Sequence, residues 1–153
     1  MNIKEKLKSL NIDLPKAPSP VGSYVAHKKI GNLIYISGQL PIKTDGQLIK
    51  GKLGENLNLE QGQEAAYFCC LNIISQLKAS CNDDLDKIRN CIKITGFVNS
   101  VDTFIDQPKV INPASELLVK LFDVKGKHTR AAVSVNSLPL GAAVEIDAIF
   151  ETV

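Results

Sequence analysis

Tryptophan is absent from this sequence of 153 residues, and methionine and arginine are rare, with one and two copies. No apolar run approaches the ~18 residues that a transmembrane helix needs. The polar N-terminus MNIKEKLKSL also lacks the apolar core of a signal peptide, so we expect a cytoplasmic protein with no membrane partner. The four cysteines form no CxxC pair and have no histidine at zinc-ligand spacing, so we expect reduced core thiols and no metal site.

Features of nucleic-acid and nucleotide binding are also missing. The formal net charge is only +2 and the lysines form no basic tract, so nucleic acid is not an expected partner. Neither GxGxxG nor a P-loop occurs, and we expect no cofactor. Ser37 in YISGQLP lies outside the GxSxG turn of serine hydrolases, and Gly38 after it indicates a close backbone approach instead.

Hydrophobic spacing predicts a single domain over residues 1–153, in which a helical extension at 1–14 precedes alternating strands and helices. A Gly31–Asn32 turn indicates a hairpin between the first two strands. The expected elements after the extension are strands at 23–30, 33–40 and 47–50, a helix at 58–80, a strand at 87–98, a helix from 113, and strands at 129–135 and 142–150.

Capping residues locate the two main helices. Asn58 with Gln61 forms the pattern of a capping box, and Asn112 followed by Pro113 indicates the N-cap and first residue of the second helix. Adjacent helical residues point about 100° apart, so one of the neighbouring cysteines 69 and 70 is expected to be partly exposed. The apolar stripe of the first helix is expected to contain Ala65, Ala66, Cys69, Ile73 and Leu77.

The order of elements predicts an α+β fold, with both helices packed on one face of an antiparallel-rich sheet. In the strand at 87–98, Ile88, Ile92 and Ile94 share the expected buried face. The strands at 33–40 and 129–135 carry apolar or small residues on both faces. A two-layer monomer would leave one of these faces in water, so we expect a homo-oligomer.

Arg130, in KHTRAAVSV, is the leading candidate for chemistry. In a chain with so few arginines, a guanidinium at this position indicates a need for its planar fork, which binds a carboxylate or phosphate through two parallel hydrogen bonds. If the last two strands form a hairpin, Arg130 and Glu145 face each other. They then form either a cross-strand salt bridge or a site in which Glu145 handles a proton or a water. His128 shares the face of Arg130 and is either an acid–base group or a surface residue.

Two stretches, GSYVAHKKIGNLIYISGQLP and TRAAVSVNSLPLGAAVEIDAIF, together resemble the RidA/YjgF family of reactive-intermediate deaminases, formerly described as endoribonuclease L-PSP. Gly22-x-Tyr24, ITGFVNS, Asn112 and the fifteen-residue spacing from Arg130 to Glu145 all match the family pattern. The resemblance implies a chorismate-mutase-like α+β fold with two helices on one face of the sheet. It also implies a homotrimer with active sites in the clefts between subunits.

The activity that the resemblance implies is hydrolysis of enamines and imines, such as 2-aminoacrylate and 2-iminopropanoate, to 2-keto acids and ammonia. Small imino and keto acids are therefore the expected ligands, with Arg130 binding the carboxylate and Glu145 orienting the attacking water. An imine is already electrophilic, so positioning and a base are sufficient for the reaction. The expected substrate-binding residues are Tyr24, Gly38, Asn112 and His128.

The sequence departs from the common family motif where His128 replaces a proline and Ala132 replaces a cysteine. With its N-terminal helix, the chain resembles a longer, divergent branch of the family. An alternative function is a non-catalytic homotrimer whose intersubunit clefts bind small carboxylates and regulate a partner. The lack of a basic stripe and of a histidine pair argues against a ribonuclease, and the scarcity of arginine argues against a chorismate mutase.

Overall fold

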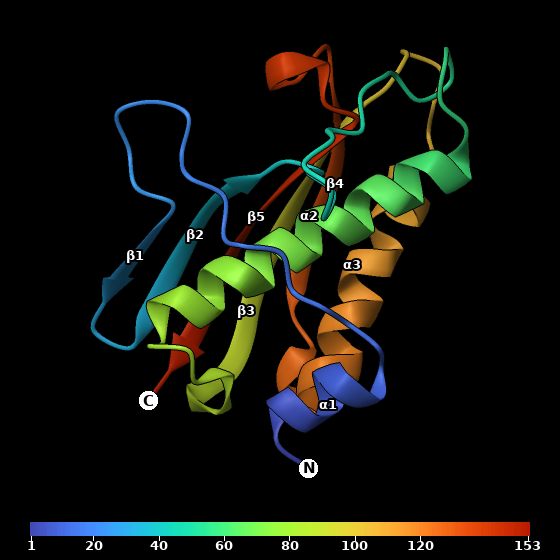
Figure 1. Ribbon diagram of the computed structural model, residues 1–153. Helices are drawn as coiled ribbons and strands as arrows, with labels where there is room; N and C mark the ends of the chain where they lie inside the picture. The colour runs from blue at the N-terminus through green and yellow to red at the C-terminus, as the bar shows by residue number, and fades with distance from the viewer.

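The computed structural model describes residues 1–153 and confirms an α+β fold in which two helices cover one face of a five-stranded sheet (Figure 1). The order of strands and helices also follows the prediction. The helices are α1 (Ile3–Ser9), α2 (Leu59–Ser80) and α3 (Gln107–Phe122), and the strands are β1 (His27–Ile30), β2 (Leu33–Gln39), β3 (Ile88–Asn99), β4 (Thr129–Val135) and β5 (Val144–Thr152). None of the helices combines the length and hydrophobicity that crossing a membrane requires.

The sheet order is β1-β2-β5-β3-β4, so the predicted hairpin between the last two strands is wrong. All neighbouring strands are antiparallel except β3 and β4, which run parallel. A parallel pair needs a crossover, and α3 supplies it between β3 and β4. β5 then occupies the other side of β3, so β4 and β5 never meet.

Helix α2 begins as predicted, with the capping box between Asn58 and Gln61. The expected apolar stripe is fully buried, but Cys69 and Cys70 are both buried as well. The Cys69 thiol points toward the carbonyl of Val144 on the sheet, whereas the Cys70 thiol points toward the carbonyl of Ala114 on α3. The predicted exposure of one cysteine is wrong because α2 is covered on two sides.

Helix α3 starts six residues earlier than predicted, at Gln107, so Asn112 is an interior residue and not an N-cap. Pro113 lies inside the helix and has no N–H to donate to the carbonyl four residues before it, that of Lys109. The Gln63 side chain of α2 donates to this carbonyl at 3.0 Å. A contact from another helix therefore satisfies the group that the proline leaves without a partner, and the helix continues through it.

Three strand predictions also need correction. The first strand is shorter and begins at His27, while the segment 47–50 makes only isolated bridges, from Leu48 to Ile42 and from Lys50 to Ala142. Its residues bridge two different segments, so no continuous ladder forms. In β3, Ile92 is exposed and Cys91 takes the buried position, because irregularities in the β3–β5 register shift the alternation of side chains.

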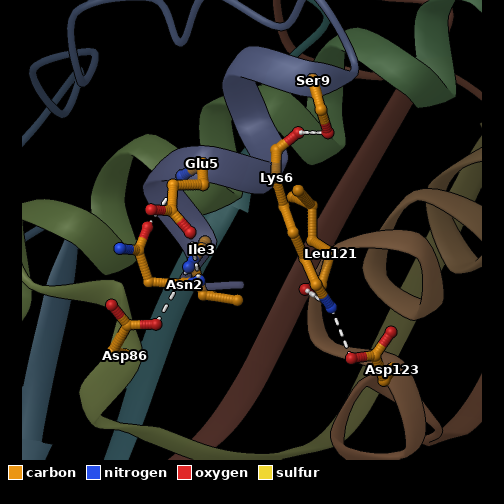
Figure 2. Close-up of polar contacts among 8 residues, drawn as sticks. All are labelled: Asn2, Ile3, Glu5, Lys6, Ser9, Asp86, Leu121 and Asp123. Carbon is orange, nitrogen blue, oxygen red and sulfur yellow. Dashed lines mark hydrogen bonds and ion pairs between the residues drawn. The ribbon is translucent and has the colours of Figure 1, made fainter.

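Helix α1 is fixed to the body of the molecule at both of its ends (Figure 2). Asn2 and Glu5 form a capping box that the sequence analysis missed, and the N–H of Ile3 donates to Asp86 Oδ1 at 2.9 Å. Lys6 pairs with Asp123 and donates to the carbonyl of Leu121 at 3.1 Å. These contacts tie α1 to the segment before β3 and to the end of α3.

Candidate functional site

Glu145 lies on the face of the sheet that the helices leave uncovered. Its neighbours Val144 and Ile146 are fully buried on the side of β5 that α2 covers, and alternate residues of a strand point to opposite faces. In the register with β3, Glu145 pairs with Phe97. The half-buried carboxyl forms no hydrogen bond or ion pair within the chain.

A β-bulge places Gly38 directly beside this carboxyl. Ile36 pairs with Ala148 and Gln39 with Ile146, so two residues of β2 lie opposite one residue of β5. A Cβ atom at Gly38 would lie 2.1 Å from Glu145 Oε1. The close approach that the sequence predicts for Gly38 is therefore an approach to the Glu145 side chain, and only glycine leaves room for it there.

Glu145 opens into a cavity of about 320 Å³. One wall is the segment between α1 and β1, which crosses the outer side of α2 (Figure 1). Ser75 and Gln76 of α2 hold this segment by donating to the carbonyls of Pro15 and Pro18 at 2.7 and 2.6 Å. Besides Tyr24 and Gly38, the walls are mainly apolar and include Pro20, Val21, Leu40, Ile42 and Leu140.

The environment of Glu145 favours its neutral form. Burial raises the pKa of the Glu145 carboxyl above its ordinary value, and the like charge of Asp147 raises this pKa further. A carboxylate whose pKa is moved toward neutrality is a better proton acceptor. The Glu145 carboxylate is therefore a base without a hydrogen-bond or ion-pair partner, and it lies beside the apolar walls of the cavity.

Arg130 lies at a second place, on the edge strand β4, and points toward α3. It pairs in register with Ile94, a core residue beneath the helices. Its Nη1 donates to Asn112 Oδ1 at 3.0 Å and to Ser115 Oγ at 3.2 Å, and its Nη2 donates to the carbonyl of Pro108 at 3.4 Å. The proximity of Asn112 to Arg130 thus comes from the second turn of α3 and not from a helix cap.

The guanidinium keeps two of its five N–H donors unpaired, one on Nε and one on Nη2. No acidic side chain forms an ion pair with Arg130. Adjacent donors of this kind bind a carboxylate in two parallel hydrogen bonds. The arrangement supplies an oriented, half-buried cation without a counter-ion.

His128 contacts Ser115 and does not contact Arg130 directly. Its Nε2 lies 2.9 Å from Ser115 Oγ, and its Nδ1 lies 2.6 Å from the carbonyl oxygen of Gly126. Ser115 is not among the site residues predicted from the sequence. Its position three residues after Asn112 was the available signal, because residues at that spacing share one face of a helix.

The predicted site residues therefore fall into two groups. Tyr24, Gly38 and Glu145 line the cavity on the open side of the sheet. Arg130 and Asn112 meet on the helical side, with His128 linked to them through Ser115. The prediction that Arg130 and Glu145 face each other in one chain is wrong, because β3 separates their strands and their side chains leave opposite faces of the sheet.

Comparison with known proteins gives the family. A family model described as "YjgF/chorismate mutase-like, putative endoribonuclease" matches residues 4–151. Protein TCP17 of Trypanosoma cruzi is 41% identical over 150 residues, which cover 97% of this chain and 93% of TCP17. Protein HMF1 of Saccharomyces cerevisiae is 30% identical over 133 residues, which cover 87% of each chain.

A solved structure agrees with these matches. The crystal structure of Atu1372 from Agrobacterium tumefaciens, a protein of unknown function, has a TM-score of 0.90 and 44% sequence identity. The similarity covers 99% of this chain and 94% of Atu1372. Since the family match and the relatives span nearly the whole chain, this protein belongs to the RidA/YjgF family.

Proposed function

We propose that this chain forms a cytoplasmic homotrimer that hydrolyses small reactive enamines and imines to 2-keto acids and ammonia in clefts between its subunits. The separation of Arg130 and Glu145 carries the proposal. Each side chain lacks a charged partner in its own chain, and the two leave opposite faces of the sheet. A site that uses both must therefore combine Arg130 of one subunit with Glu145 of its neighbour.

In such a cleft, the free donors of Arg130 bind the carboxylate of a 2-imino acid and hold its imine carbon near Glu145. Glu145 accepts a proton from a water as the water oxygen bonds to that carbon, and the C=N electron pair moves to the nitrogen, which is protonated. In the resulting carbinolamine the hydroxyl loses its proton, the C–O bond becomes C=O, and the C–N bond breaks with its electron pair leaving on the protonated nitrogen. A 2-keto acid and ammonia leave, and the net reaction consumes one water.

The residues on each side suit these roles. Asn112 and Ser115 hold Nη1 of Arg130, so the guanidinium is already oriented before ligand binds. The raised pKa of Glu145 makes the carboxylate a stronger base than a glutamate in water. The largely apolar cavity beside it limits the water around a hydrolysable substrate and leaves space for the substrate's side chain.

An imine assay tests the proposal. An amino-acid oxidase acting on alanine supplies 2-iminopropanoate, semicarbazide traps what is not hydrolysed, and formation of free pyruvate is followed. We expect the wild type to accelerate imine loss over buffer. Arg130→Ala should lose at least about 10²-fold in kcat/KM, and Arg130→Lys should recover little of it because an ammonium cannot form the bidentate contact. No acceleration by the wild type on several imino acids would exclude the activity.

The oriented cation of Arg130 also fits a second function, a non-catalytic trimer whose clefts bind small carboxylates and regulate a partner. This function predicts that pyruvate raises the melting temperature of the wild type but not of Arg130→Ala, and that no imine is hydrolysed. Turnover separates the two functions, since ligand-induced stabilisation is common to both.

A further inference from the structure

We infer that Ser115 and His128 are positioning residues, which fix the guanidinium of Arg130 and thereby set the affinity of the site for its carboxylate ligand. The inference rests on the proposed role of Arg130 as the carboxylate-binding group. It replaces the sequence prediction that His128 itself touches the substrate. Ser115 is the link, since it contacts both Arg130 and His128.

The hydrogen bonds around His128 show which group donates at each step of the series from Gly126 through His128 and Ser115 to Arg130. The carbonyl of Gly126 can only accept, so Nδ1 of the imidazole carries a proton and donates to it. In the neutral ring Nε2 is then an acceptor, and the Ser115 hydroxyl donates to it. A lone pair of Ser115 Oγ remains to accept the N–H of Arg130.

The Gly126 carbonyl, where this series of hydrogen bonds begins, is anchored to α3, the helix that also carries Ser115. A Cβ atom at Gly126 would lie 2.2 Å from the carbonyl oxygen of Leu118, so the turn after α3 packs directly on the backbone of α3. The carbonyl that orients His128 is therefore fixed relative to Ser115, three residues before Leu118. The imidazole of His128 therefore lies between Ser115 and the Gly126 carbonyl, and α3 fixes the positions of both.

The result is an Arg130 with one nitrogen fully occupied. Asn112 and Ser115 take both N–H groups of Nη1, which leaves the unpaired donors on Nε and Nη2 for the ligand. Without Ser115, or without the His128 bond that orients its hydroxyl, the guanidinium gains freedom to rotate. Binding a carboxylate then requires ordering the side chain again, and affinity falls.

Ser115 and His128 also resemble a nucleophile and its base, but the surroundings favour positioning. Ser115 Oγ accepts a hydrogen bond from a guanidinium, which lowers the electron density that a nucleophile needs. No backbone N–H pair is directed at a substrate oxygen next to it, because Ser115 lies within the continuous helix α3.

The test measures pyruvate affinity by calorimetry together with KM and kcat for 2-iminopropanoate. Ser115→Ala should weaken pyruvate binding and raise KM about tenfold, the effect of losing one hydrogen bond to a charged group, with kcat changed less than about threefold. His128→Asn keeps a donor near the Nδ1 position but loses the hydrogen bond to Ser115. Its pyruvate affinity and KM should therefore match those of Ser115→Ala. His128→Gln, whose amide oxygen reaches the Nε2 position, should recover most of the affinity.

Two further measurements make the result decisive. The double variant Ser115→Ala/His128→Asn should bind pyruvate no more weakly than Ser115→Ala alone, because both changes break the same chain. His27→Gln, at the only other histidine, should leave pyruvate affinity and KM unchanged. Unaltered pyruvate affinity in a folded Ser115→Ala would overturn the inference, as would a loss of kcat at constant KM. Pyruvate affinity is measured without turnover, so failure of the hydrolase proposal alone leaves this test intact.

Discussion

Arg130 and Glu145 project from opposite faces of one sheet, with β3 lying between their two strands. Arg130 is held by α3 and points toward the helices, whereas Glu145 lies in a cavity on the open side. Half-burying Arg130 and Glu145 without a partner of opposite charge costs free energy of desolvation, unless a ligand or another subunit supplies that partner. In the proposed trimer, Arg130 of one subunit and Glu145 of its neighbour complete each other.

Removing the charge of Glu145 should affect the chemical step more than binding. Glu145→Gln is isosteric and cannot accept a proton, so we expect kcat to fall about 10²-fold while pyruvate affinity stays near the wild-type value. In the wild type, activity should be lost as the pH falls and Glu145 becomes protonated. The midpoint should lie above 4.5, the ordinary value for glutamate, because burial raises the pKa of Glu145. A pH–rate profile flat down to pH 4 would rule out Glu145 as the base.

The same substitution should stabilise the fold at neutral pH. Since the folded pKa of Glu145 is raised, the free energy of unfolding is highest where the carboxyl is protonated in both states, and it falls as the pH rises through the folded pKa. Glu145→Gln has no charge to bury. Its melting temperature at pH 7 should exceed that of the wild type by a small amount, on the order of 1 °C. The difference should disappear at pH 4.

Gly38→Ala tests the placement of the Glu145 carboxyl by sterics alone. The new methyl group would lie 2.1 Å from Oε1 and 2.8 Å from Cδ, so the carboxyl must move. The obstructing atoms are the end of a side chain, which can rotate away, so the melting temperature should change little. Displacing a catalytic group by about 1 Å costs up to ~10²-fold in rate, and we expect a loss of this order in kcat.

Gly31→Ala is the matched control for that experiment. Gly31 has a φ of +58° and no atom within 4 Å of an added Cβ, so alanine there strains the hairpin turn without touching the site. This variant should lower the melting temperature and keep kcat. If Gly38→Ala instead keeps full activity, the position of the Glu145 carboxyl beside Gly38 is not the position used in catalysis.

Local sequence patterns were enough to predict the helices and their order. Asn58 and Gln61 interact over three residues, so their pattern can be read without knowledge of the rest of the fold. The start of α3 was not predictable in this way. Pro113 normally indicates a helix start, and it lies inside α3 because Gln63, fifty residues earlier, bonds to the carbonyl of Lys109.

For the candidate site, the sequence indicates individual residues but not how they are arranged in space. Arg130 and Glu145 can be identified from the sequence, since a rare guanidinium and its spacing to an acid are visible in one dimension. Their predicted pairing across a hairpin is wrong, because strands adjacent in sequence commonly pair but β4 and β5 do not. The insertion of β5 between β2 and β3 depends on contacts between segments more than a hundred residues apart, and no local pattern contains it.

The most direct test of the central claim is a mixed trimer. Arg130→Ala and Glu145→Ala subunits with different tags are co-expressed, and only assemblies carrying both tags are purified. Every mixed cyclic trimer then has one cleft that combines an intact Arg130 with an intact Glu145 of its neighbour, so we predict about one third of wild-type imine hydrolysis. Mixed trimers as inactive as the two parents would contradict a site shared between subunits.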